Sequence, residues 1–172
     1  MALISVRAAR VDDAPTLCAA EQEIARVPGF LVSQPDELSA REFASLIASL
    51  TNGAGCYFVA EGNGKVLGHA FLKPMDLRAV SHVFRLTIAV HSGHGGRGVG
   101  TALMGALIDW ASRSPAAGKI ELIVRSSNER ALRLYRKFGF REEGRFRNRI
   151  RLADGSYIDD ISMAWFPKHA AI

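Results

Sequence analysis

The chain of 172 residues is 48% hydrophobic and 23% charged, proportions that are typical of a folded domain and exclude a disordered protein. Its formal net charge is +5, but the basic residues are spread along the sequence without a basic run, so the charge does not indicate a nucleic-acid partner. No apolar run approaches the ~18 residues of a membrane span and no signal-peptide layout is present, so neither a membrane partner nor export is expected.

Length predicts a single domain over residues 1–172. The two cysteines stand apart without metal-ligand spacing, so no metal site is predicted. Isolated cysteines of this kind are typical of a reducing compartment, which favours a cytoplasmic location.

Two helices are predicted in the N-terminal part of the chain. Asp12 or Asp13 can cap a helix that continues to the break at Pro28-Gly29. Ser39 has capping-box spacing to Glu42 and opens a second helix.

Strands are predicted on both sides of these helices. Residues 4–8 alternate apolar and polar side chains, as a strand with one buried face does. Residues 56–61 and 65–72 form two further strands, and the Gly-Asn-Gly turn between them is a strong hairpin signal. Another strand, at 82–90, follows an irregular loop.

The strand that ends at Val90 leads through a glycine-rich turn directly into a helix. Glycines occupy positions 93, 95, 96, 98 and 100, and from Val99 onward the apolar residues form one helical stripe. The free N–H groups and partial positive charge of a helix N-terminus attract an anion, and glycines let a phosphate approach the backbone without meeting a Cβ. Arg97 adds a cation beside the turn. The pattern predicts a phosphate-binding loop rather than a simple surface turn.

Three kinds of phosphate loop compete for this stretch. A P-loop requires Lys and then Ser or Thr after its last glycine, whereas Gly98 is followed by Val99. Gly93, Gly95 and Gly98 satisfy the dinucleotide fingerprint literally, but the next strand ends in an arginine and too little chain remains for a second nucleotide-binding half. The third kind of phosphate-binding loop has the sequence Arg-Gly-Val-Gly after an apolar strand. This sequence is present at positions 97–100.

The last third of the chain predicts a strand, a short helix and a second hairpin. Residues 119–124 are almost wholly apolar, as in a buried parallel strand. Ser126 has capping-box spacing to Glu129 and opens a helix, which ends where Gly139 can adopt a left-handed conformation. Two strands flank a turn at 153–156. The order β-α-α-β-β-β-α-β-α-β-β predicts an α/β fold, in which a mixed sheet of about seven strands has helices on both faces.

Two motifs within this order of elements resemble the GNAT superfamily of N-acetyltransferases. The loop at 95–100 is similar to the family's coenzyme A pyrophosphate loop. The segment 128–140 is similar to the family's second hallmark, Asn-x-x-Ala-x-x-x-Tyr-x-x-x-Gly-Phe. The resemblance covers essentially the whole chain and implies the GNAT fold. Residues 82–86 and 154–163 look like the branch of the family that acts on small amines such as amino acids.

The resemblance implies acetyl-CoA as the acyl donor, with pantetheine between two splayed central strands and held by backbone groups of the first. The family loop usually begins with Arg or Gln, and Gly95 in that place removes a side chain that would brace the loop; His94 and Arg97 are candidates to compensate. Carried over residue by residue, the cofactor-binding set is Ile88, Ala89, Val90, Gly95, Gly96, Arg97, Gly98, Val99, Gly100, Thr101, Asn128, Ala131 and Tyr135.

The resemblance also implies a general acid. Tyr135 matches the family's tyrosine, and a phenol with a pKa near 10 suits a thiolate leaving group. Spacing alone leaves open that Tyr135 is a core aromatic on an amphipathic helix. The base is less defined, because the central strand has no carboxylate where some family members carry one. His82 is the nearest titratable candidate, and the alternative is that it packs or faces solvent.

Charged residues of the last hairpin have two interpretations. Arg145, Arg147, Arg149 and Arg151 occupy alternate positions, so they are predicted to share one sheet face, which either recognises a substrate carboxylate or is solvated. The carboxylates at 159 and 160 either orient an ammonium group or face water.

The activity that the resemblance implies is transfer of an acetyl group from acetyl-CoA to the primary amine of a small molecule, such as an amino acid. Three alternatives stay open: a non-catalytic acyl-CoA sensor, an acetyltransferase of protein or peptide N-termini, and an NADP-binding module. The expected partner is a small-molecule amine, and the resemblance suggests a homodimer by analogy alone.

Overall fold

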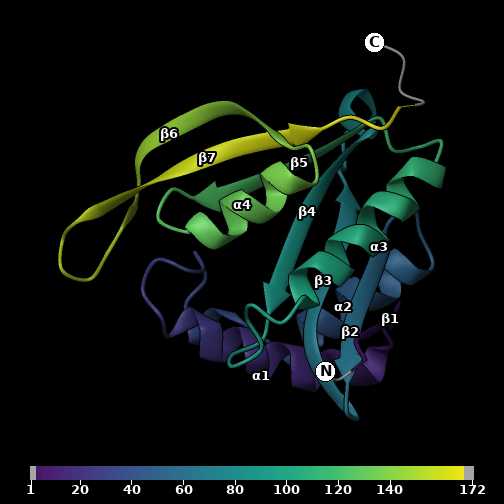
Figure 1. Ribbon diagram of the computed structural model, residues 1–172, viewed down its shortest axis with the longest axis horizontal. Helices are drawn as coiled ribbons and strands as arrows, with labels where there is room; N and C mark the ends of the chain where they lie inside the picture. Colours follow the sequence, from purple (N-terminus) through teal and green to yellow (C-terminus); the bar gives the residue numbers. More distant parts are fainter. Residues whose placement is uncertain (1–2, 169–172) are drawn as a thin grey trace.

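The computed structural model describes residues 3–168, which form one mixed β-sheet with helices on both faces (Figure 1). The sheet has seven strands in the order β1-β2-β3-β4-β5-β7-β6. The strands are β1 (Ser5–Ala8), β2 (Cys56–Gly62), β3 (Lys65–Pro74), β4 (Val83–Val90), β5 (Lys119–Arg125), β6 (Arg141–Arg151) and β7 (Tyr157–Trp165). The helices are α1 (Ala14–Ala25), α2 (Ala40–Thr51), α3 (Val99–Arg113) and α4 (Glu129–Lys137). The α/β class and the element order predicted from the sequence are confirmed.

Neighbouring strands are antiparallel except for β4 and β5, which are parallel. Their pairing covers only Val83–Arg85 opposite Lys119–Glu121, although β4 continues to Val90 and β5 to Arg125. The two strands therefore diverge toward their carboxyl ends, as Figure 1 shows. This divergence interrupts the hydrogen bonding in the middle of the sheet.

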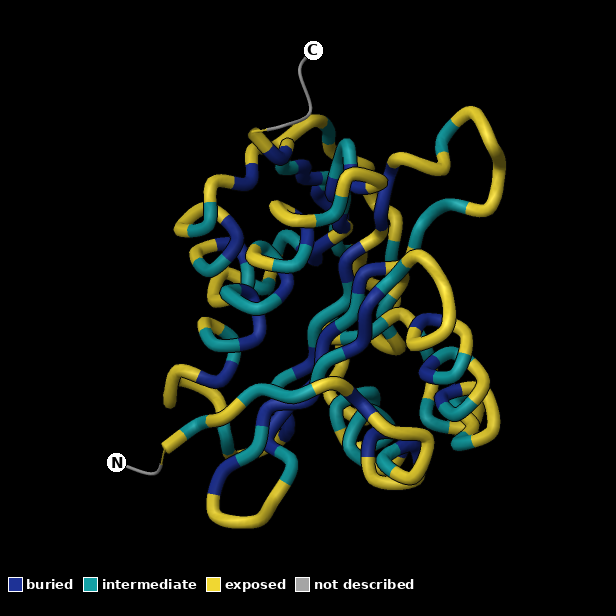
Figure 2. Tube along the Cα trace, turned by 90° about the vertical axis from the view of Figure 1, so that its right-hand side faces the viewer, coloured by how far each residue is buried: buried dark blue, intermediate teal, exposed yellow. Residues whose placement is uncertain are grey.

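Two layers of helices bury the two faces of the sheet. In Figure 1, α3 and α4 lie in front of the sheet and α1 and α2 lie behind it. Figure 2 shows that the buried segments follow the central strands, while the hairpin tips are exposed. Successive side chains of a strand point to opposite faces, so each strand contributes to the core under both helix layers. The larger cluster includes Phe84, Leu103, Met104, Leu107 and Ile120, and the smaller one includes Leu17, Phe43, Ile47, Tyr57 and Val59.

The predicted start of α2 is confirmed and that of α4 is wrong. Ser39 caps α2, because its hydroxyl accepts a hydrogen bond of 3.3 Å from the Glu42 N–H. The cap of α4 is Asn128 rather than Ser126: Asn128 Oδ1 accepts from the Ala131 N–H at 3.1 Å. Ser126 is still paired with the sheet, since its N–H donates to the Asp159 carbonyl of β7.

The prediction that four arginines of β6 share one face is wrong. The register of β6 against β7 shifts in the middle of the strand, where Asn148 has a φ of +50°. Arg145 donates to Asp159 (3.1 Å), whereas Arg149 pairs with Asp160 (3.3 Å). Adjacent strand residues point to opposite faces, so the two arginines lie on opposite sides of the sheet. Neither aspartate is among the residues that line the cavity described below.

None of the helices within residues 3–168 combines the length and the apolar character that a membrane crossing requires.

Candidate functional site

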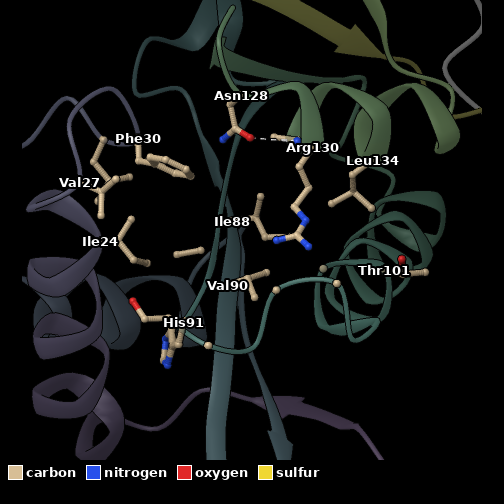
Figure 3. A pocket seen from close by; sticks show the side chains of 18 of the residues that line it. Ile24, Val27, Phe30, Ile88, Val90, His91, Thr101, Asn128, Arg130 and Leu134 are labelled. Atoms are coloured by element: carbon tan, nitrogen blue, oxygen red, sulfur yellow. Dashed lines mark hydrogen bonds between the residues drawn. The ribbon is translucent and has the colours of Figure 1, made fainter. Parts of the chain in front are cut away.

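A cavity of about 610 Å³ opens where β4 and β5 diverge. Three parts of the chain line it: the end of β4 with the glycine loop and the start of α3, the first turns of α4, and the end of α1 with the segment that follows. Figure 3 shows Ile24, Val27 and Phe30 on one side of the end of β4, with Arg130 and Leu134 on the other. The lining residues are Ile24, Val27, Phe30, Leu31, Ile88, Ala89, Val90, His91, Ser92, Gly93, Gly95, Gly96, Gly98, Gly100, Thr101, Asn128, Arg130, Ala131, Leu134 and Tyr135.

The glycine loop ends at the N-terminus of α3. Gly96 and Gly98 have φ values of +78° and +90°, which a residue with a Cβ rarely adopts. Gly98 is the N-cap of α3 and brings no side chain to the first N–H groups of the helix. The Ala102 N–H bonds back to the Gly98 carbonyl, so the N–H groups before it remain available to a ligand. Together with the helix dipole they form an anion site of the predicted kind.

The side chain of Arg130 reaches from α4 to this loop (Figure 3). A Cβ built on Gly95 would overlap Arg130 Nη1, and one built on Gly96 would lie 2.7 Å from Nη2. Arg130 therefore fills the space that a side chain at position 95 would take, and it brings a cation to the α3 N-terminus. Sequence reasoning proposed His94 and Arg97 for this compensation and missed Arg130. The available signal was its place inside the 128–140 motif.

Tyr135 lies on α4 and lines the cavity, with 6% of its surface exposed. Its ring packs against Phe140, at 5.9 Å between centroids. Burial raises the pKa of the Tyr135 phenol above its ordinary value near 10, so the hydroxyl stays protonated at neutral pH. Tyr135 is thus a packed aromatic that lines the cavity and keeps its phenolic proton at neutral pH.

Most of the predicted cofactor-binding residues meet around this cavity. Arg97 and Val99 do not line it: the Arg97 side chain is exposed, and Val99 is buried in the core beneath α3. The predicted cofactor-binding residues that line the cavity are Ile88, Ala89, Val90, Gly95, Gly96, Gly98, Gly100, Thr101, Asn128, Ala131 and Tyr135.

The structure does not bring His82 to the cavity. His82 is exposed and lies just before β4, at the opposite end of that strand from Val90. Because a strand rises ~3.3 Å per residue, about 26 Å separate the two residues. The His82 carbonyl accepts from the N–H groups of Gly118 and Lys119, which is a structural role. A base at His82 is therefore not part of the function proposed below.

Apolar side chains form the wall that faces Arg130 and Leu134. Ile24 comes from the last turn of α1, and Val27, Phe30 and Leu31 come from the segment after it. Sequence reasoning assigned Ile24 and Val27 only to the apolar stripe of a helix and did not connect them with the glycine loop. No local pattern could do so, because the wall joins segments that are far apart in the sequence.

Charge in the cavity is one-sided. Among the lining residues that the structure describes, none carries a carboxylate, and Arg130 supplies a positive charge. Within residues 3–168 no group of three His, Cys, Asp or Glu side chains is arranged to hold a metal ion.

Comparison with known proteins agrees with this geometry. The model of the acetyltransferase (GNAT) family matches residues 20–140, and the chain belongs to this family. It is 34% identical to the L-amino acid N-acetyltransferase AaaT of Escherichia coli over 102 residues, which are 59% of this chain and 62% of that protein. It is 32% identical to the N-alpha-acetyltransferase RimI of Mycobacterium tuberculosis over 97 residues, 56% of this chain and 59% of RimI. Each match thus spans less than two thirds of the relative's own length.

The fold extends over nearly the whole chain in solved structures. The yncA protein of Salmonella typhimurium, solved with its cofactor acetyl-CoA, superposes with a TM-score of 0.87 at 20% identity. The superposition covers 98% of this chain and 96% of that one, which confirms the predicted GNAT fold.

Proposed function

We propose that this chain transfers an acetyl group from acetyl-CoA to the primary amine of a small molecule. The observation that carries the proposal is the cavity at the divergence of β4 and β5, closed at one end by a helix N-terminus without a side-chain cap and by Arg130. One edge of β4 is bonded to β3 along its length, and the other edge has no strand of the described chain beside it after Arg85. Those free backbone groups suit the amides of pantetheine.

The residues divide the chemistry between them. Acetyl-CoA supplies the activated acyl group. The α3 N-terminus, the glycine loop and Arg130 bind its phosphates, because backbone N–H groups and a guanidinium both favour phosphate oxygens. Tyr135 donates its phenolic proton to the departing thiolate, and burial keeps that proton in place at neutral pH.

The acceptor reacts as the neutral amine. No carboxylate lines the described cavity, so the amine proton leaves to solvent rather than to a carboxylate that acts as a base. A cavity without carboxylates disfavours polyamines and aminoglycosides, whose several positive charges would find no partner there. The apolar wall of Ile24, Val27 and Phe30 favours an amino acid or related metabolite with an apolar side chain. The match to the L-amino acid N-acetyltransferase AaaT supports the same class.

A peptide N-terminus is the second candidate acceptor. The match to RimI, an N-alpha-acetyltransferase, favours it. A non-catalytic acyl-CoA sensor shares the same cavity but has no use for a protonated Tyr135, so turnover separates the two. An NADP-binding module is disfavoured by the single parallel strand pair, since a dinucleotide fold needs repeated βαβ units.

The test is release of free thiol from acetyl-CoA in the presence of a panel of amines. The panel contains apolar L-amino acids, their N-methylated analogues, a polyamine, an aminoglycoside and short peptides with free N-termini. We expect turnover with at least one apolar L-amino acid and none with the polyamine. Turnover on peptides alone would move the proposal to protein N-termini, and binding of acetyl-CoA without any turnover would favour the sensor.

Three broader expectations stay predictions. The two cysteines are free and buried, which supports a reducing, cytoplasmic setting. The homodimer and the single domain over residues 1–172 await measurement of the molecular mass in solution and of the cooperativity of unfolding.

A further inference from the structure

Three titratable side chains from separate parts of the protein form a hydrogen-bonded series beside the cavity, and its two histidines are buried. Glu21 of α1 lies 2.8 Å from His69 of β3, measured between Oε1 and Nε2. The other ring nitrogen of His69, Nδ1, lies 3.1 Å from Nε2 of His91, the residue that follows β4. His91 Nδ1 lies 3.2 Å from the carbonyl oxygen of Val66. His69 is wholly buried and His91 is 7% exposed.

The contacts fix which nitrogens carry protons. A carbonyl only accepts, so His91 Nδ1 carries a proton and donates it to Val66. Burial and the neighbouring His69 lower the pKa of His91 to about 4, so at neutral pH its Nε2 is an unprotonated acceptor. His69 must then donate from Nδ1. His69 Nε2 meets the Glu21 carboxylate at 2.8 Å, which completes the series of hydrogen bonds.

The surroundings of His69 are aromatic. Phe43 packs edge-on against His69 at 6.1 Å, and Tyr57 lies tilted against it at 5.8 Å. The Tyr57 hydroxyl is buried and has no hydrogen-bond partner among the described residues. Hydrogen bonds in such a setting are strong when complete, and an unpaired group is costly when one partner is removed.

The hydrogen-bonded series of Glu21, His69 and His91 connects the two walls of the cavity. Glu21 lies one helical turn before Ile24, which belongs to the apolar wall. His91 begins the glycine loop: its N–H donates to the Leu67 carbonyl, and its own carbonyl accepts from His94. In Figure 3 the His91 ring is turned away from Arg130, toward the interior, so it does not face the reacting groups.

We propose that Glu21, His69 and His91 are positioning residues, which hold the α1 wall and the start of the glycine loop at a fixed separation and so set the affinity of the cavity for both acetyl-CoA and the acceptor. This inference rests on the function proposed above. It assigns a role to two buried histidines and a partly exposed glutamate that the acyl-transfer chemistry does not use. Glu21 and His69 lie outside the cavity lining and the His91 ring is turned away from Arg130, so we assign the three residues an action through the walls.

Two substitutions of Glu21 separate hydrogen bonding from mere packing. Gln in Glu21→Gln keeps a hydrogen-bonding group beside His69 Nε2, so His69 still donates from Nδ1 to His91. Met in Glu21→Met has similar volume and no hydrogen-bonding group of comparable strength, so His69 Nε2 is left unpaired. Glu23 lies on the exposed side of the same helix, and Glu23→Met is the matched control for loss of a charge from α1.

We expect Glu21→Met to raise both the dissociation constant of acetyl-CoA and the KM of the acceptor by about tenfold, which is the scale of one unpaired buried group, while kcat at saturation changes less than threefold. Glu21→Gln and Glu23→Met are expected to stay within twofold of the wild type. A stability defect alone would lower Tm and leave the affinity of the folded protein unchanged. Wild-type affinity in Glu21→Met, or equal impairment in Glu21→Gln, would overturn the proposal.

A measurement on the wild-type protein keeps the proposal testable even if Glu21→Met does not fold. In ¹⁵N-detected spectra of the imidazoles, protons are expected on Nδ1 of both His69 and His91, and saturation with acetyl-CoA is expected to shift the signals of both rings. A proton on His91 Nε2, or chemical shifts of His69 that do not change on addition of acetyl-CoA, would contradict the proposal. Failure of the wild type to bind acetyl-CoA at all would instead refute the proposed function.

Discussion

The two walls of the cavity differ in how they are built. The donor wall, proposed to bind acetyl-CoA, is formed by the glycine loop and the α3 N-terminus; it is made mainly of backbone, and its key residues lie close together in the sequence. The acceptor wall, proposed to bind the amine, is formed by the end of α1 and the following segment and is made of side chains: Ile24, Val27, Phe30 and Leu31. Backbone donors recognise phosphate whatever the neighbouring side chains are, whereas an apolar wall changes its preference with each substitution. One wall therefore suits a constant donor and the other an acceptor that can vary.

The largest expected effect touches neither wall and concerns Tyr135 alone. Tyr135→Phe keeps the ring and its packing on Phe140 but removes the proton donor. We expect kcat to fall by about 10²–10⁴-fold while the dissociation constant of acetyl-CoA changes little. Thiol release measures the first quantity and calorimetry the second. A wild-type rate in this variant would rule out the acid role.

The donor wall is broken most directly at Gly98. A β-branched residue at a φ of +90° is strained, so it would distort the turn that presents the α3 N-terminus to a ligand. Gly98→Val is expected to weaken acetyl-CoA binding on the order of a hundredfold. The control is Gly105→Ala within α3, where a Cβ meets nothing within 4 Å. This control should bind normally and gain about 0.5–1 kcal/mol of stability, since Ala replaces Gly in a helix interior.

The pH dependence tests whether the acceptor reacts as a free amine. Below the pKa of the acceptor amine, kcat/KM is expected to rise about tenfold per pH unit, because the neutral fraction of the amine increases by the same factor. The acid must remain protonated, and burial raises the pKa of Tyr135, so any decline in activity is displaced to above about pH 10. A decline between pH 7 and 9, or a flat profile, would contradict this account.

Arg130 is expected to strengthen the donor wall through charge. Arg130→Ala should weaken acetyl-CoA binding about tenfold at low ionic strength and less at high salt, as expected for one exposed cation beside a phosphate. Arg133 lies one turn further on α4 and pairs with Glu129, so Arg133→Ala is the matched control for loss of positive charge. Equal affinities of the two variants would remove Arg130 from the binding site.

The smallest effect is expected at the acceptor wall. Phe30 is 51% exposed, so Phe30→Ala should leave the fold intact and raise the KM of an apolar amino acid about fivefold, without changing acetyl-CoA affinity. Phe166 is similarly exposed at 42% and lies outside the cavity lining, and Phe166→Ala should have no effect on either constant. A loss of acetyl-CoA affinity in Phe30→Ala would contradict the assignment of acetyl-CoA to one wall and the acceptor to the other.

The same division between the walls explains what the sequence could predict. The element order and the anion site at α3 follow from local patterns: glycines before a helix, caps and apolar spacing. The place of Tyr135 at the site follows from the resemblance of 128–140 to the GNAT family, since spacing alone also fits a core aromatic. The cap of α4 was predicted two residues early, because Ser126 and Asn128 both have the chemistry of a cap and only packing selects between them. The faces of the β6 arginines were mispredicted because Asn148 and the register shift break the strand's period.

Residues that meet only through the tertiary fold could not be predicted. Arg130 replaces the missing side chain at Gly95 across space, and the apolar stripe of α1 gives no sign that its last turn faces a cavity. His69 lies on β3, His91 follows β4, and Glu21 reaches His69 from α1. The histidine chosen from the sequence, His82, had the right chemistry at the wrong end of β4.

The most direct test of the central claim is a calorimetric titration of the wild-type protein with acetyl-CoA and, under the same conditions, with NADPH. The account predicts binding of acetyl-CoA with a dissociation constant in the range typical of enzyme substrates, about 1 μM to 1 mM, and no detectable heat with NADPH. Binding of NADPH in preference to acetyl-CoA, or of neither, would contradict the assignment of the glycine loop.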